Sequence, residues 1–211
     1  MAGDGTPPEA PLAPPPQGGA AGGPAEPDPR RPLGGAAARP FVALWPGAGE
    51  RRALHDWQRS IAWPMGVRLT PAQDLHLTLV FIGAVDAASL DAVVAVAAGV
   101  PNEPFELILD QVEFWRGGLC VAMPSKLPEP LVRRQRAIDT ALRGLGLPID
   151  ERPWRPHLTL ARRATGARVA GALPPLRWHG SGHVLAQREG EHYAVLRRFR
   201  RRQPRRRSLA A

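Results

Sequence analysis

The sequence contains a single cysteine, Cys120, so neither an intrachain disulfide nor a metal site built from several cysteines can form. This excludes the small secreted scaffolds that disulfides hold together. Lysine is almost absent too, since Lys126 is the only one and the other basic residues are arginine. The longest apolar run, Ala92 to Val100, is too short to span a bilayer, which takes about 20 residues. No basic region followed by an apolar stretch opens the chain, so we expect no secretory signal and a cytoplasmic protein.

Proline and glycine are abundant but unevenly placed. Residues 1–40 hold 11 prolines and 8 glycines and no aromatic residue. Such a segment buries too little apolar surface to offset the entropy lost on ordering, so we predict a disordered leader over residues 1–38. The leader is either a solvated extension or a proline-rich arm that binds a partner. The whole chain is 44% hydrophobic, which is enough for the remainder to build a core.

Basic residues gather at the other end of the chain. The formal net charge is +9, and residues 200–211 contain six arginines and no acidic residue. We predict a folded domain over residues 39–199 and a disordered arginine-rich tail over residues 200–211. Arginine attracts phosphate without reading a base sequence, so the tail is either an anchor for nucleic acid or a solvated end.

Between these ends the hydrophobic pattern predicts alternating helices and short strands. Leu54, Trp57 and Ile61 form one apolar helical stripe, and Asp86 is a suitable N-cap for the next helix. The predicted helices are 48–60, 87–98 and 128–145. The predicted strands are 40–45, 75–82, 105–109, 112–115, 119–123, 157–162, 184–187 and 193–199. Short strands with few long helices indicate the α+β class with antiparallel sheet.

The tetrapeptide His-Leu-Thr-Leu occurs twice, at residues 76–79 and 157–160, 81 residues apart. Each copy lies in a predicted strand that follows a predicted helix and a proline-containing loop. A repeat on this scale predicts two similar lobes related by pseudo-symmetry. Side chains alternate along a strand, so the histidine and threonine of each copy share one face while the leucines anchor the other. We expect the polar face of both copies to line a cleft between the lobes.

Paired imidazole and hydroxyl groups suit a reaction at phosphorus. An imidazole has an unperturbed pKa near ~6.5, so one histidine can accept a proton while the other donates one near neutral pH. A threonine hydroxyl can donate a hydrogen bond to a phosphate oxygen. Each histidine taken alone is more typical of a structural hydrogen bond, and a metal site is a further alternative, although the two strands offer no carboxylate or cysteine beside it. The repetition of the whole motif favours in-line displacement at phosphorus.

Three segments together resemble a known family. They are RPFVALWP at 39–46, LHLTLVFIG at 75–83 and RPHLTLAR at 155–162, and the resemblance extends to FWRGG at 114–118 and YAVL at 193–196. On these motifs the chain resembles the RNA 2′,3′-cyclic phosphodiesterases (ThpR, or the 2′-5′ RNA ligase LigT) of the 2H phosphoesterase superfamily. The resemblance covers about residues 39–199 and says nothing about either end.

The resemblance implies a bilobal α+β fold, with an antiparallel sheet and helices in each lobe and the active-site groove between them. It implies hydrolysis of the 2′,3′-cyclic phosphate at an RNA end to a 2′-phosphomonoester. Neither a metal nor another cofactor is implied, nor a protein partner, and we expect a monomer. Carried over by motif, His76 is the general acid and His157 is the base that activates water. Thr78 and Thr159 hold the phosphate oxygens.

The resemblance also implies two further substrate contacts. Arg162 matches a position that contacts the RNA end, and Phe81 matches one that stacks on a base. Each lies five residues after the histidine of its motif. Regular alternation turns both side chains away from the histidine face unless the strands twist or bulge.

Other functions fit the same residues. Ligation of a cyclic phosphate end to a 5′-hydroxyl is the reverse chemistry through the same groups. A non-catalytic RNA-binding protein would use the basic tail, but it has no need of paired imidazoles. A small cyclic nucleotide or ADP-ribose cyclic phosphate is a further substrate class, although the 20 basic and 15 acidic residues of the segment 39–199 favour polyanionic RNA.

Overall fold

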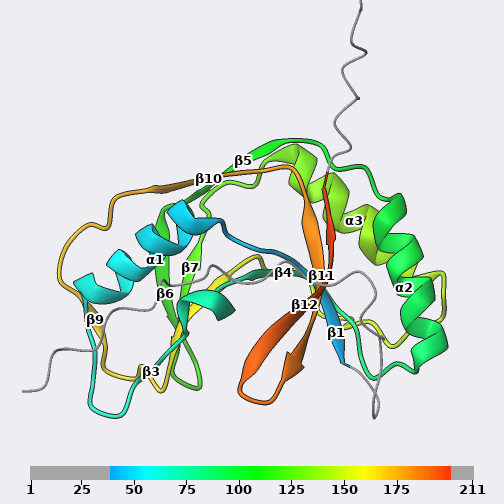
Figure 1. Ribbon diagram of the computed structural model, residues 1–211. Coiled ribbons are helices and arrows are strands. Elements are labelled where there is room, and N and C mark those ends of the chain that lie inside the picture. The colour runs from blue at the N-terminus through cyan, green and yellow to red at the C-terminus, as the bar shows by residue number, and fades with distance from the viewer. Residues whose placement is uncertain (1–38, 201–211) are drawn as a thin grey trace, which may run out of the picture.

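The computed structural model describes residues 39–200 (Figure 1). The predicted leader, 1–38, lies outside the described residues, and so does the predicted tail apart from Arg200. Among residues 39–200, no helix is long and apolar enough to cross a membrane.

The elements follow one another in this order: β1 (Pro40–Leu44), α1 (Ala48–Ser60), β2 (Ile61–Ala62), β3 (Arg68–Leu69), the 3-10 turn η1 (Ala72–Asp74), β4 (Leu77–Phe81), α2 (Ala87–Gly99), β5 (Phe105–Leu109), β6 (Gln111–Trp115), β7 (Leu119–Met123), α3 (Glu129–Arg143), β8 (Leu158–Arg162), β9 (Arg168–Val169), β10 (Leu176–Gly180), β11 (His183–Glu189) and β12 (His192–Phe199). All three predicted helices and all eight predicted strands are present. The sequence pattern missed β2, β3, β9 and β10, three of which are only two residues long.

Local chemistry explains where the helices begin and end. The Asp86 carboxylate accepts a hydrogen bond of 2.7 Å from the Ser89 amide, which caps α2 as predicted. Helix α3 carries a proline in its first turn and stops at Gly144. Its buried face consists of Leu131, Ile138 and Leu142 together with polar side chains.

The central sheet has the strand order β12-β11-β1-β4-β8-β7-β6, with β3 added at β8. All of its pairs are antiparallel, which confirms the α+β class with antiparallel sheet. The two strands that carry the repeated motif, β4 and β8, are neighbours in the middle and pair through Leu77 and Leu158. Strands β5 and β10 form a separate ribbon, and so do β2 and β9.

Each half of the domain consists of one motif and the helix before it in sequence, and each of these helices contacts the motif of the other half. Helix α1 precedes the first motif in sequence, yet Gln58 on α1 donates a hydrogen bond of 2.8 Å to the Leu160 carbonyl in the second motif. In the same way Gln135, on the helix α3 that precedes the second motif, donates to the Leu79 carbonyl in the first. Figure 1 shows the consequence, with α1 on the side of β6 and β7 and α2 and α3 on the opposite side of the molecule. Equivalent glutamines on equivalent carbonyls support the predicted internal pseudo-symmetry.

Candidate active site

The pairing of β4 with β8 brings the two motifs together. With Leu77 opposite Leu158 in an antiparallel register, the next positions face each other crosswise: His76 with Thr159, and Thr78 with His157. The leucines of both motifs are fully buried, whereas the threonines are partly exposed. The predicted alternation of the motif is therefore confirmed, and each histidine lies beside the threonine of the other copy.

Two cavities open beside these pairs. The larger one, of about 790 Å³, is lined by Thr78, His157, Phe81 and Arg162 among others. The smaller one, of about 170 Å³, is lined by His76, Thr159 and again Arg162. Because Arg162 lines both, we treat them as the two ends of one groove, which holds all six residues that the sequence singled out.

Both central strands bulge, which accounts for the positions of Phe81 and Arg162. In the pairing of β4 with β1, Val42 lies opposite Val80 and Ala43 opposite Thr78, so Leu79 is an extra residue without a partner. The second motif repeats this, because the register of β8 on β7 skips Leu160. One extra residue shifts the alternation by one position. The shift returns the two side chains to the histidine face.

Phe81 presents one free ring face. The residue is 48% exposed, and its ring stacks on Phe41, with 6.2 Å between the ring centroids and an angle of 5°. Phe41 in turn lies 4.9 Å from the His76 ring. The buried face of Phe81 is thus fixed by the protein, and the opposite face is accessible from the groove.

His76 sits in an aromatic box. Its Nδ1 lies 2.6 Å from the Asp74 carbonyl, and because a carbonyl only accepts, Nδ1 carries the proton and Nε2 is left for chemistry. Trp45 stacks on the imidazole at 5.3 Å and 7°, and Tyr193 meets it edge-on at 4.8 Å. Burial lowers the pKa of His76, the carbonyl and the carboxylate of Asp74 oppose that shift, and His157 and Arg162 add to it.

His157 has the same backbone contact but a different surrounding. Its Nδ1 lies 2.7 Å from the Arg155 carbonyl, and its ring packs at 4.5 Å from Trp115. The Arg155 guanidinium lies 4.1 Å from the centre of the Trp115 ring, and Glu113 accepts hydrogen bonds from both side chains, at 2.7 and 2.6 Å. Burial lowers the pKa of His157, and the positive charges of Arg155 and Arg162 lower it further, against the effect of the carbonyl.

Asp74 holds the loop before His76 in place, although no motif in the sequence marks it as a functional residue. The Asp74 carboxylate is buried and accepts hydrogen bonds from His192 Nδ1 at 2.8 Å and from the Tyr193 amide at 3.1 Å. It therefore ties η1 to the start of β12, 118 residues away in sequence. His192 lies outside the repeated motif, and this contact gives it a structural partner.

Within residues 39–200, no group of three or more histidine, cysteine, aspartate and glutamate side chains is arranged to hold a metal ion. The groove instead offers imidazoles, hydroxyls, arginine and aromatic faces. Such a set can move protons and bind an anion next to a planar base.

Comparisons with known proteins agree with this description. A profile of the family described as the 2′-5′ RNA ligase superfamily matches residues 50–192. The RNA 2′,3′-cyclic phosphodiesterase of Escherichia coli (strain K12) is 29% identical over 141 residues, which cover 66% of this chain and 80% of that protein. That of Thermus thermophilus is 28% identical over 176 residues, or 76% and 89% of the two chains. The crystal structure of E. coli LigT in apo form matches with a TM-score of 0.68 and 25% identity, covering 79% of this chain and 98% of the other.

Proposed function

The chain belongs to the 2′-5′ RNA ligase superfamily, and on that premise we propose that it hydrolyses the 2′,3′-cyclic phosphate at an RNA end to a 2′-phosphomonoester. One observation carries the proposal. The pairing of β4 with β8 places two pairs of an imidazole and a hydroxyl, His76 with Thr159 and His157 with Thr78, in one groove. An acid and a base on either side of a phosphate are what in-line displacement requires.

In the proposed reaction, His157 acts as the general base. It takes a proton from water as the water oxygen bonds to phosphorus. The bond from phosphorus to O3′ breaks on the opposite side, and His76 gives its proton to O3′. The products are a 2′-phosphomonoester and a 3′-hydroxyl, and exchange with solvent returns both imidazoles to their starting forms.

The remaining residues stabilise charge and orient the substrate. The hydroxyls of Thr78 and Thr159 donate to the non-bridging phosphate oxygens, where negative charge increases in the transition state. Arg162, which lines both ends of the groove, supplies positive charge to the same phosphate. The terminal base stacks on the exposed face of Phe81.

The roles of the two histidines are supported by the side chains that stand two residues before each of them. The Asp74 carboxylate raises the pKa of His76 against the effect of burial, which favours the protonated form that an acid needs. The charge of Arg155 lowers the pKa of His157, which favours the neutral form that a base needs. All of these groups come from one chain, so we propose that the monomer is active.

The test uses a short RNA that ends in a 2′,3′-cyclic phosphate, incubated with the protein in the presence of EDTA. We expect the cyclic end to open and the product to carry its phosphate on O2′. A 3′-phosphate product, or no turnover, would contradict the proposal. Adding an RNA with a 5′-hydroxyl shows whether the same groove also joins ends, since ligation would yield a longer strand with a 2′-5′ bond.

A further inference from the structure

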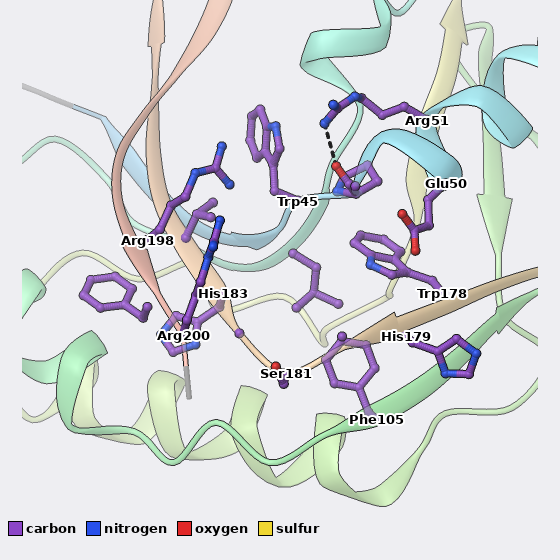
Figure 2. A pocket seen from close by; sticks show the side chains of 17 residues that line it. Trp45, Glu50, Arg51, Phe105, Trp178, His179, Ser181, His183, Arg198 and Arg200 are labelled. Carbon is purple, nitrogen blue, oxygen red and sulfur yellow. Dashed lines mark hydrogen bonds between the residues drawn. The ribbon is translucent and has the colours of Figure 1, made fainter. Parts of the chain in front are cut away.

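A separate cavity of about 530 Å³ is lined by Trp45 (Figure 2), and the ring of Trp45 also stacks on His76. It is bounded by the start of α1, the turn between β10 and β11, and the end of β12. Its volume falls within the range of about 300–1,000 Å³ that is typical of small-ligand sites. Nothing in the proposed reaction uses this cavity.

Its charged lining favours an anion. Three guanidinium groups line it, those of Arg51, Arg198 and Arg200, against one carboxylate, that of Glu50. The Glu50 carboxylate folds back over Gly47 at the start of α1, where a negative charge complements the helix dipole. In Figure 2, Arg51 and Arg198 extend on either side of the Trp45 indole. Arg51 uses one donor on the Pro46 carbonyl, at 2.7 Å, and a guanidinium has five.

The sheet register connects this cavity to the catalytic motif. Thr78 lies opposite Ala43, Ala43 opposite Val184, and Val184 opposite Arg198. This row crosses four neighbouring strands, so its ends are three strand spacings, or about 14 Å, apart. A stacked strand advances about 3.4 Å along its axis for each nucleotide, and an extended strand advances farther. A phosphate about two to four nucleotides from the RNA end therefore reaches Arg198.

Trp45 is shared by both regions. Its ring stacks on His76, and the same residue lines the cavity, so Trp45 connects the histidine of the first motif with the cavity.

We propose that this cavity binds a nucleotide on the 5′ side of the cyclic phosphate, with Arg51 and Arg198 holding its backbone phosphates. This inference rests on the proposed function and deepens it. The preferred substrate is then an RNA several nucleotides long and not a dinucleotide or a free cyclic nucleotide.

The experiment compares substrate lengths in the full chain. We would measure kcat/KM for a dinucleotide and a hexanucleotide that both end in a 2′,3′-cyclic phosphate, and take the ratio of the longer to the shorter. The variants are Arg198→Ala and Arg51→Ala. Each has a matched control in the adjacent residue, Arg197→Ala and Arg52→Ala, neither of which lines the cavity.

Wild type should prefer the hexanucleotide, and each cavity variant should reduce that ratio by about tenfold to hundredfold, the size of one lost charged hydrogen bond. The controls should keep the ratio within about twofold of wild type. The salt dependence of hexanucleotide binding should also weaken by about 0.7 in log–log slope for each lost phosphate contact. Because every ratio includes the dinucleotide rate, a misfolded variant cannot imitate this result.

Equal ratios in cavity variants and controls, or no length preference in wild type, would overturn the cavity proposal while leaving the phosphodiesterase intact. If wild type opens neither substrate, the proposed function fails instead. Binding of a hexanucleotide with a 2′-phosphate end, followed by fluorescence anisotropy, then still tests the cavity through the same four variants.

Discussion

The two halves of the groove share a backbone but differ in charge. In both, a histidine donates from Nδ1 to the carbonyl two residues earlier, a threonine follows at the second position, and a bulge comes at the third. Two residues before the histidine, however, one half has the buried Asp74 and the other has the exposed Arg155. Five residues after it, one half has Phe81 and the other Arg162.

Under the proposed function, this difference assigns two chemical roles to two copies of one backbone arrangement. The backbone geometry fixes the tautomer and direction of both imidazoles in the same way. Burial lowers the pKa of both imidazoles; the Asp74 carboxylate opposes this shift at His76, whereas the Arg155 guanidinium adds to it at His157. The proposed function divides base stacking and phosphate binding in the same manner between Phe81 and Arg162.

The largest effect should come from removing either histidine. His76→Ala and His157→Ala should each lower kcat/KM by roughly 10²–10⁴, the range for a lost general acid or base. If the halves differ as proposed, the first variant loses the alkaline limb of the pH–rate profile and the second loses the acidic limb. The exposed His55 of α1 supplies the control, His55→Ala, which should behave like wild type. Near-normal turnover in either groove variant would refute the assignment.

Next in size are the two positions that follow the bulges. Arg162→Ala should lower kcat/KM by about 10²-fold, because the charge that stabilises the transition state is lost. Phe81→Ala should mainly raise KM, by about tenfold, since stacking of one base contributes about 1–3 kcal/mol. Steady-state kinetics separate the two outcomes.

Their matched controls are Arg168→Ala and Phe114→Ala, which remove an exposed arginine and an exposed phenylalanine that line neither end of the groove. Identical kinetic effects of Arg162→Ala and Phe81→Ala would contradict the assignment of phosphate binding to Arg162 and base stacking to Phe81.

The buried imidazole of His183, outside the groove, allows loss of activity in acid to be distinguished from unfolding in acid. His183 is 2% exposed and contacts Asn102 and the Ala97 carbonyl, and burial lowers its pKa from 6.5 to about 4. Since the unfolded chain binds this proton more readily, stability is complete above pH ~6.5 and falls by about 3 kcal/mol as the pH drops to about 4. Urea unfolding at several pH values should show this slope, and His183→Gln should remove this part of it. An unchanged slope in that variant would assign the acid sensitivity to other groups.

The smallest effects are shifts of the pH–rate limbs. Asp74→Asn removes a charge that raises the pKa of His76, so the alkaline limb should move to lower pH. Arg155→Ala removes a charge that lowers the pKa of His157, so the acidic limb should move to higher pH. Asp74→Asn should also cost about 1–3 kcal/mol in the free energy of unfolding, because the His192 ring and the Tyr193 amide lose a charged, buried acceptor. Shifts of the same limb in both variants would remove the distinction between the halves.

Much of this site could be predicted from the sequence because its information is local. The repeated His-Leu-Thr-Leu carries both the proposed catalytic residues and the strand alternation, and capping residues such as Asp86 mark helix starts. The bulges at Leu79 and Leu160 could not be predicted, since they depend on which neighbouring residues pair. The contact of Asp74 with His192 could not be predicted either. It joins residues 118 positions apart, and no local pattern in either segment indicates that they meet. Likewise the cavity lined by Trp45 is assembled from four distant segments.

The exchange of helices between the halves makes the fold indivisible. A chain cut between α2 and β5 would separate Gln58 from Leu160 and Gln135 from Leu79, and each fragment would leave its half of the groove uncovered. Neither fragment can complete a hydrophobic core of its own, so we expect them to be unstructured apart and to recover activity only when mixed. The internal repeat therefore produces one cooperative folding unit instead of two domains.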